Sequence, residues 1–531
     1  MPTSAQSSFR LILPRQFKRL RALSRWKQIK RWSLLWALGV CAFPVAAQQN
    51  DAPLSAIDWL SQSIDPVRIA EPPTTAGVTT PQITVTPLDR PSKDGIGLLG
   101  SKVTKLPPSI WSSSNEITLV NLVRAERVET LPAIQDFLKI LMLAEANPPL
   151  GAGPDGMLFL ARVDKLLDLG ALEQAKALIE AAEPDTAPLF RRWFDVALLT
   201  GTEHAACDAV KNTPSIAPTF SARIFCLARN GDWNAAAVTL NSHRALGDIT
   251  DEEDALIARF LDPELFEGEP PLERPARVSP LMFRMQEAVG EPLITANLPL
   301  IFAHADLRTT TAWKSQIEAA ERLARHGAVS ENVLLDVYTA RRPAASGGIW
   351  DRADAIQKFD RAMQAGNADQ IASTLPDAWN AMKRAQAEVL FAQLYGNALQ
   401  EISLSQAATD IAFDIGLLSS EYETIANNAT DQDPFLIAIA QGTPQEVRVT
   451  TPRELAIQAA FNGAPPPDVL QQLLKDGKLG EALLRAIATF DAGYRGDTGS
   501  LTEALALFRS VGMEDLARRS ALQLIILDRH T

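Results

Sequence analysis

The stretch Gly231-Asp232-Trp233-Asn234-Ala235-Ala236 joins two apolar segments and carries a spacing that recurs along the chain. A glycine ends one apolar segment, and an alanine follows five residues later inside the next. The same spacing occurs at 170–175, 201–206, 477–482 and 512–517, and the first three glycines are 31 and 30 residues apart. Glycine permits the left-handed conformation that ends a helix, and a small alanine lets two helices pack closely. The spacing therefore predicts helical hairpins.

A single helical hairpin leaves one apolar face bare, and it covers that face by stacking on a neighbouring hairpin. The turn at 231–236 resembles the inter-helix turn of tetratricopeptide repeats, in which Gly-Asp-aromatic-x-x-Ala is usual. The resemblance covers about five units; its period is shorter than the family's about 34 residues, and the small residue usual midway along the first helix is absent. It implies an all-α fold with a TPR-like α-solenoid. The alternative is an irregular helical bundle in which the spacing recurs by chance.

Proline-rich breaks suggest how the chain is divided. The part rich in Pro, Thr and Ser before the helical periodicity is expected to be an extended arm with a short amphipathic helix at 55–64 and one short strand at 82–86. The predicted organisation is a signal peptide at 1–47, the arm at 48–114, a helical repeat domain at 115–261, a Pro-rich linker at 262–280, a central helical domain at 281–464 and C-terminal hairpins at 465–531.

The first 47 residues have the order of a secretory signal peptide. Nine Lys and Arg residues, with no Asp or Glu among them, precede an apolar run at 32–45. The small residues Ala46 and Ala47 follow, which predicts cleavage between Ala47 and Gln48 and export to the periplasm. The apolar run is shorter than the about 20 residues that a spanning helix needs, so an uncleaved N-terminal anchor is the weaker alternative.

The negative charge of the chain argues against nucleic acids as partners. The whole sequence has 51 basic and 63 acidic residues, a net charge of −12, and the part after residue 47 has 42 against 63, a net charge of −21. A surface this acidic repels phosphate backbones and anionic lipid headgroups. We therefore expect no nucleic-acid binding. The mature part is also expected not to span the membrane, and other envelope proteins or peptides are the expected partners.

The residues that carry chemistry form no catalytic, metal or cofactor-binding constellation. No Cys-x-x-Cys or His-x-x-x-His spacing occurs, and no nucleophile elbow or phosphate-binding loop is present. His304 and Asp306 point to different faces of a helix, so a structural histidine is expected. Glu421, which follows Ser419 and Ser420, resembles the catalytic Glu of peptidoglycan-cleaving domains, but the Gly-and-Gln segments that those domains place downstream are absent.

One loop combines the features of a small-anion site. Arg341 and Arg342 are adjacent cations in an acidic protein, and Ser346-Gly347-Gly348 is predicted to open a helix whose free N–H groups and dipole attract anions. Together with Arg352, these residues are candidate contacts for a carboxylate or a phosphate. The alternative is a structural loop in which Ser346 caps the helix and Trp350 packs in the core.

Cys207 and Cys226 are the two cysteines that remain after removal of the predicted signal peptide. An oxidising periplasm permits a disulfide between them. The expected helix limits place the two cysteines about one helical turn out of level, so two buried free thiols are the alternative.

We expect a periplasmic helical-repeat scaffold or adaptor that binds other envelope proteins without catalysis, because stacked hairpins present long concave surfaces. The alternatives are an envelope enzyme that acts on cell-wall polymer and a small-anion binder that uses the 341–352 loop.

Overall fold

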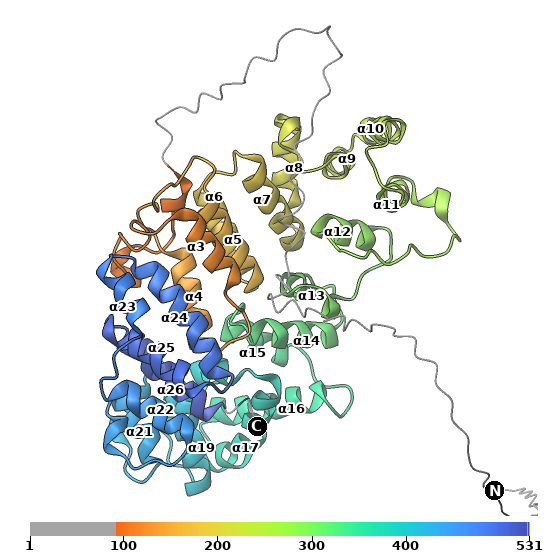
Figure 1. The fold of residues 1–531 in the computed structure, drawn as a ribbon. Helices are drawn as coiled ribbons and strands as arrows, with labels where there is room; N and C mark the ends of the chain where they lie inside the picture. Colours follow the sequence, from red (N-terminus) through yellow and green to blue (C-terminus); the bar gives the residue numbers. More distant parts are fainter. Residues whose placement is uncertain (1–91, 528, 530–531) are drawn as a thin grey trace, which may run out of the picture. The chain divides into compact units, whose positions relative to one another are not determined.

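The computed structural model describes residues 92–527 and 529, and all regular structure in this part is helical (Figure 1). It contains 25 α-helices and six short 3-10 helices, and its β-pairing is limited to two isolated bridges, between Leu99 and Ala144 and between Asn115 and Leu150. The predicted all-α class is therefore confirmed. The predicted signal peptide, its cleavage site at Ala47 and Gln48, the helix at 55–64 and the strand at 82–86 lie outside the described residues.

The first described residues pack against the helices that follow them. Arg162 is fully buried on α5, and its guanidinium donates to the carbonyl oxygens of Asp94, Ile96, Met142 and Ala144. Residues 92–114, which were expected to end an extended arm, are thus part of the core. The elements in this region are η1 Lys93–Gly95, α2 Ser101–Thr104, α3 Glu116–Ala125, α4 Pro132–Leu143, α5 Met157–Asp168 and α6 Leu172–Ala181.

Six helices follow as three successive hairpins. Helices α7 and α12 contribute side chains to two hydrophobic clusters. Leu189 of α7 and Phe283 of α12 belong to the main cluster, whereas Phe194 of α7 and Met285 of α12 belong to a second cluster. The second cluster is formed by the hairpins themselves. The elements are α7 Ala187–Thr200, α8 Glu203–Asn212, η2 Pro214–Ile216, α9 Phe220–Arg229, α10 Trp233–Leu246, α11 Asp251–Leu261, η3 Pro263–Phe266 and α12 Pro280–Ala288.

All five Gly-to-Ala turns join consecutive helices, as predicted. The glycines have positive φ values between 72° and 84°, and the alanines five residues later are fully buried. The turns lie between α5 and α6, α7 and α8, α9 and α10, α23 and α24, and α25 and α26. The glycine conformation and the small alanine therefore do in the structure what their spacing predicts.

The proline-rich segment at 262–280 does not separate two cores. Leu256 and Ile257 before it and Leu281 and Met285 after it belong to the same cluster. Arg259 fixes the segment by donating to the carbonyl oxygen of Pro270 and by pairing with Glu291 at 2.7 Å. The predicted linker is therefore the long connection within a hairpin, between α11 and α12.

The remaining helices continue the main cluster to the end of the chain (Figure 1). Their first members are η4 Thr295–Asn297, η5 Leu300–Phe302, α13 Ala303–Asp306, α14 Trp313–Ala324, α15 Glu331–Thr339, α16 Ile349–Ala365 and α17 Ala368–Ala385. The next are α18 Glu388–Gln400, α19 Gln406–Leu417, α20 Tyr422–Asn428, α21 Pro434–Gln441, η6 Pro444–Glu446 and α22 Pro452–Phe461. The last four are α23 Asp468–Lys475, α24 Leu479–Tyr494, α25 Thr498–Ser510 and α26 Glu514–Ile526.

The last hairpins pack against the first described helices. The N–H of Gly480 donates to the carbonyl oxygen of Ile110, and the fully buried Trp111 lies against the same glycine. Gln523 of α26 accepts from the N–H of Ala133 at the start of α4. In an open array of repeats each unit contacts only its neighbours, so these contacts between distant parts of the chain depart from that simple pattern.

Candidate functional site

The candidate site is a cavity of 230 Å³ among α7, α9, α11 and α12, where three helices begin. Thr219 caps α9 by accepting from the N–H of Ala222, and Ser279 caps α12. Thr250 and Glu253 form a reciprocal capping box at the start of α11. Caps fix where a helix starts, so the short polar side chains that begin these helices also place the residues around the cavity.

The cavity has an apolar interior and a polar rim. Its apolar lining residues are mostly buried, whereas most of the polar ones lie nearer to solvent. The apolar residues are Phe194, Pro218, Ala222, Leu256, Ile257, Leu281, Met282 and Met285, and the polar residues are Arg191, Asp195, Thr219, Ser221, Glu253, Arg277 and Ser279. Two methionines make such a surface adaptable, because their unbranched side chains repack around different shapes.

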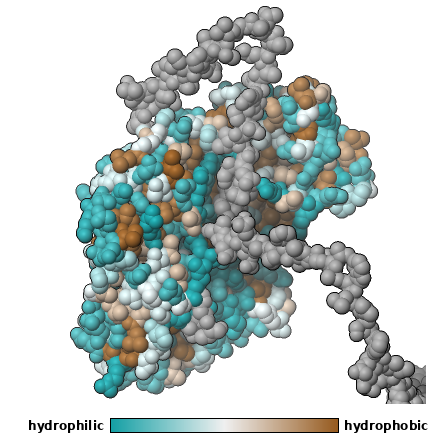
Figure 2. Space-filling model, in the orientation of Figure 1, coloured by the Kyte–Doolittle hydropathy of each residue, from teal (hydrophilic) through white to brown (hydrophobic). Residues whose placement is uncertain are grey.

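The size of the cavity fits one apolar side chain. An apolar cavity of about 150 Å³ accepts benzene, whereas pockets for small molecules are typically about 300–1,000 Å³. At 230 Å³ the cavity lies between these limits. On the face shown in Figure 2, apolar residues form separate patches among hydrophilic ones. The cavity is therefore the size of one large apolar group.

Asp195 places an ionisable group beside this apolar interior. It is 7% exposed, and burial raises the pKa of its carboxyl from 3.8 to about 7, although Arg191 and Arg192 act in the opposite direction. The Nε atom of Arg191 lies 3.9 Å from Oδ2 of Asp195. Arg192 forms an ion pair with Asp164 of α5 instead. Its Nε and a terminal nitrogen lie 2.5 and 2.7 Å from the two carboxylate oxygens. The site therefore carries a carboxyl group that changes charge near neutral pH.

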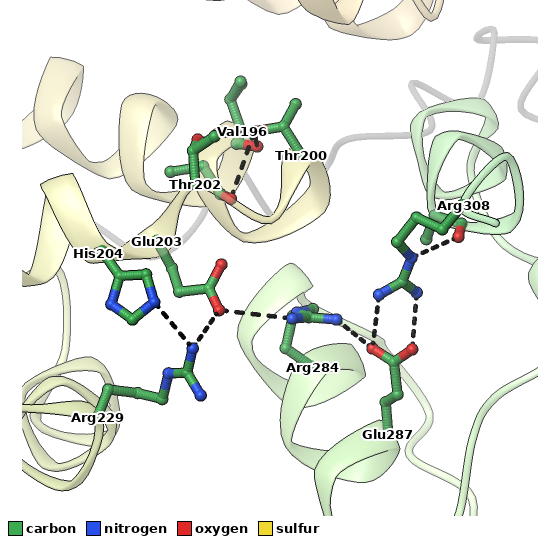
Figure 3. A network of polar contacts seen from close by, with 11 residues as sticks. Val196, Thr200, Thr202, Glu203, His204, Arg229, Arg284, Glu287 and Arg308 are labelled. Carbon is green, nitrogen blue, oxygen red and sulfur yellow. Dashed lines mark hydrogen bonds and ion pairs between the residues drawn. The ribbon is translucent and has the colours of Figure 1, made fainter. Parts of the chain in front are cut away.

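A polar network links α8, α9 and α12 to Arg308, which follows α13 (Figure 3). Glu203, the first residue of α8, lies 3.0 Å from Arg229 at the end of α9 and 3.5 Å from Arg284 of α12. Arg284 also pairs with Glu287, which accepts two hydrogen bonds from Arg308 at 2.7 and 3.2 Å. Four segments of the chain are thus linked through alternating arginines and glutamates.

This network holds the hairpins in place. Glu203 is only 3% exposed, and its Oε2 atom has no hydrogen-bond partner in the described part of the protein. Loss of one partner from a buried pair leaves an uncompensated charge, at a typical cost of about 3–5 kcal/mol. Arg229 and Arg284 lie on α9 and α12, which also line the cavity, so the network helps to fix the relative position of these two helices.

The structure does not assemble the residues of the 341–352 loop into one anion site. Arg341 and Arg342 are exposed, and their guanidinium groups have no hydrogen-bond or ion-pair partner within the described residues. Gly348 is the N-cap of α16, and Ser346 makes no capping hydrogen bond. The N–H of Gly347 donates to Asp351 at 2.8 Å. One of the N–H groups that were expected to bind an anion at this helix start therefore already donates to Asp351 of the same helix.

Arg352 faces the interior of the protein. Its Nε and a terminal nitrogen each donate to Glu321 at 2.7 Å, and Glu321 is 2% exposed. The hydroxyl of the buried Tyr338 donates to the same carboxylate at 2.8 Å. Arg352, Glu321 and Tyr338 therefore link α14, α15 and α16. Arg352 does not contribute to an anion site with Arg341 and Arg342. Trp350 packs against Trp313, with 5.2 Å between ring centroids.

Cys207 and Cys226 form a disulfide between α8 and α9, with their α-carbons 4.9 Å apart. The helix limits explain how they meet. α9 begins at Phe220, capped by Thr219, which is later than the sequence suggests. Cys226 therefore lies six residues into its helix, while Cys207 lies five residues before the end of α8 at Asn212. The expected offset of about one turn is absent.

Sequence reasoning did not find the cavity. Its lining comes from four helices, and Arg191 and Arg277 are far apart in the chain. A local signal that could have marked one of these helix starts is Thr250-x-x-Glu253, whose spacing is that of a capping box. His304 has a structural role: its Nε2 donates to the carbonyl oxygen of Gly170 at 2.7 Å.

Two further observations concern the described residues as a whole. None of their helices combines the length and the apolar character needed to cross a membrane. Their His, Cys, Asp and Glu side chains form no group of three arranged to hold a metal ion. Comparison of the chain with protein-family models, with curated proteins and with solved structures gives no match. The function therefore has to be argued from the geometry of this chain alone.

Proposed function

We propose that this protein is an exported helical-repeat scaffold that binds a partner protein or peptide, without catalysis, by taking one of the partner's apolar side chains into the cavity among α7, α9, α11 and α12. The cavity itself carries the proposal. It is lined by the first helices of three successive hairpins and by α12, its interior is apolar, and its volume of 230 Å³ fits one large side chain. An anchor residue in a pocket with a polar rim is how protein interfaces concentrate their binding energy.

The TPR-like character of α5 to α12 is part of the same proposal. Three Gly-to-Ala turns support it, because Gly170, Gly201 and Gly231 all have positive φ and each joins two consecutive helices. In such repeats the stacked first helices provide the surface for extended partners. Export to the periplasm is supported by the order of charged, apolar and small residues before Gln48. N-terminal sequencing of the native protein tests it: a chain that begins at Met1 and stays in membranes contradicts export.

The binding proposal is tested by blocking the cavity in living cells. Ser221 lines the cavity and is partly exposed, so Ser221→Trp is expected to fill the entrance without disturbing the interior. Ser242 lies on the exposed face of α10, and Ser242→Trp is the matched control. A photo-crosslinking amino acid at position 219 traps the bound partner in either background.

Four outcomes decide the proposal. We expect one defined crosslinked species that persists with Ser242→Trp and falls at least tenfold with Ser221→Trp, since loss of a central anchor costs about 2 kcal/mol or more. Crosslinks at position 219 that are absent, or that are unchanged by Ser221→Trp, contradict a partner at the cavity. Release of soluble fragments from cell-wall sacculi by the purified protein would favour the enzymatic alternative.

A further inference from the structure

A second pocket, far from the cavity in sequence, lies among α18, α19 and α20 and the segment after α20, with a volume of 480 Å³. This volume is within the about 300–1,000 Å³ that is typical of small-molecule sites. Seven of its twelve lining residues are amides or threonines, two are glutamates and three are apolar. None is basic or aspartic, so the pocket offers neutral hydrogen-bonding groups and negative charge.

Two glutamines present fixed hydrogen-bonding atoms at this pocket. The Nε2 group of Gln400 donates to the carbonyl oxygens of Gly396 and Ala412, at 3.1 and 2.8 Å. Because a carbonyl oxygen only accepts, these bonds fix the orientation of the amide and leave its Oε1 as an acceptor. That oxygen has no partner within the described chain.

Gln432 is fixed in the opposite sense. Its Oε1 accepts from the N–H groups of Thr430 and Asp431, at 3.1 and 3.2 Å. A backbone N–H only donates, so Nε2 is the group that Gln432 leaves as a donor. The pocket thus holds one oriented acceptor and one oriented donor before any ligand arrives, which lowers the entropic cost of binding.

The other polar groups extend this alternation. Asn428 and Glu401 are exposed and have no hydrogen-bond or ion-pair partner among the described residues. Glu421 is exposed and makes only a long contact, 3.5 Å, with the hydroxyl of Thr424. A carboxylate only accepts, whereas an amide both donates and accepts. A ligand that satisfies all of these groups must both donate and accept hydrogen bonds at closely spaced positions.

We propose that this pocket binds a neutral sugar. Each sugar hydroxyl donates one hydrogen bond and accepts others, which matches fixed amides beside carboxylates. The apolar residues Phe413, Ile425 and Ala429 contact the C–H faces of a sugar ring. Glu401 and Glu421, without a basic residue beside them in the pocket, disfavour phosphates, carboxylates and acidic sugars through like-charge repulsion.

Saturation-transfer NMR and calorimetry with the purified full chain test this inference. The neutral probes are maltose and N,N′-diacetylchitobiose, galacturonic acid is the anionic probe, and tetra-alanine is a neutral peptide probe. We expect at least one neutral sugar to bind in the millimolar range or tighter, and galacturonic acid and tetra-alanine to bind more weakly.

Asn428→Leu and Asn427→Leu form a matched pair of variants. Asn428 lines the pocket and makes no internal hydrogen bond, whereas Asn427 accepts from Gln441 at 3.1 Å and lies outside the lining. Asn428→Leu is expected to weaken sugar binding about three- to tenfold, as loss of one hydrogen bond does, while the melting temperature stays unchanged. Asn427→Leu is expected to leave binding unchanged.

The result that overturns the inference is specific. Absence of binding by both neutral sugars, preference for galacturonic acid or tetra-alanine, or equal sugar binding by Asn428→Leu and Asn427→Leu would each exclude a neutral-sugar site at this pocket. None of these results bears on the cavity among α7, α9, α11 and α12, because the two sites share no residue.

Discussion

Single buried residues determine much of the chemistry of this protein. Asp195 lies beside the apolar interior of the cavity, and burial raises the pKa of its carboxyl to about 7. In the unfolded chain the same carboxyl has an ordinary pKa near 3.8. Between these two values the folded state holds a proton that the unfolded state has lost. The free energy of unfolding therefore falls as pH rises through this window and levels off above it.

Asp195→Asn tests this effect. The variant keeps a neutral polar side chain, so it loses the titration and its stability no longer falls between about pH 4 and about pH 7. We expect the variant to become more stable relative to the wild type as the pH rises from about 5 to about 8, so that the difference in melting temperature increases. The corresponding change in the free energy of unfolding is a few kcal/mol at most. Thermal denaturation at several pH values measures it. The exposed Asp208→Asn on α8 is the control, and a constant difference between Asp195→Asn and wild type would refute the assignment.

The burial and pairing of charged side chains could not be predicted from the sequence. In the sequence, Arg352 is a cation close to a glycine-rich loop. In the structure it points to the interior, because it donates two hydrogen bonds to Glu321 of another helix. Arg162 is likewise fully buried among carbonyl oxygens of two separate segments, at 94–96 and 142–144. Burial and pairing of these side chains depend on contacts between helices, and local spacing in the sequence does not carry that information.

At the scale of elements, the local signals were sufficient to predict the hairpins at the Gly-to-Ala turns but not every helix limit. A glycine at the turn and an alanine five residues later act within a few residues of each other, so the hairpins were predicted and found. The start of α9 was misplaced because the 3-10 turn Pro214–Ile216 and Pro218 precede the helix, and the capping residue is Thr219. A shift of a few residues in a helix start is enough to change whether two cysteines are level.

Ala236→Trp tests the packing within a hairpin. Ala236 on α10 is fully buried, so a tryptophan there overpacks the contact with α9 and is expected to destabilise the protein by about 1–3 kcal/mol. Ala237 is the next residue on the same helix and is exposed, which makes Ala237→Trp the control. Thermal melting followed by circular dichroism compares them. Equal melting temperatures for the two variants would show that Ala236 does not face its partner helix.

The disulfide is tested by thiol labelling of denatured, unreduced protein. We expect the peptides that contain Cys207 and Cys226 to remain unlabelled, because their α-carbons lie close enough for a bond. Reduction is expected to lower stability by about 3 kcal/mol, the value of the chain-entropy model for a loop of this size. Labelling of both cysteines without a reducing agent would instead establish two free thiols.

At the scale of the whole molecule, contacts between distant segments distinguish this fold from a simple array of repeats. α26 packs on α4, and the start of α24 packs on the segment before α3. In an array whose units contact only their neighbours, a perturbation stays near its site. Here a change in the C-terminal hairpins must reach the first described residues. This pairing could not be predicted from the sequence, because no local pattern around Trp111 or Gly480 identifies the other residue.

Gly480→Ala tests this coupling, with Gly499→Ala as its matched control in a neighbouring helix. A β-carbon at position 480 would lie 2.5 Å from the ring of Trp111 and 2.6 Å from the carbonyl oxygen of Ile110, whereas the nearest atom to one at position 499 is 3.4 Å away, on Asp497. Alanine normally stabilises a helix relative to glycine by about 0.5–1 kcal/mol.

The two substitutions are therefore expected to have opposite signs. Gly499→Ala should leave stability unchanged or raise it slightly, while Gly480→Ala should lower it by about 1–3 kcal/mol, because overpacking outweighs the helical preference. Hydrogen exchange followed by mass spectrometry locates the effect: Gly480→Ala should increase amide exchange in residues 106–114 as well as in α24. Faster exchange confined to α23 and α24 would mean that the C-terminal hairpins unfold independently of the first segment, and that the end-to-end packing does not couple them.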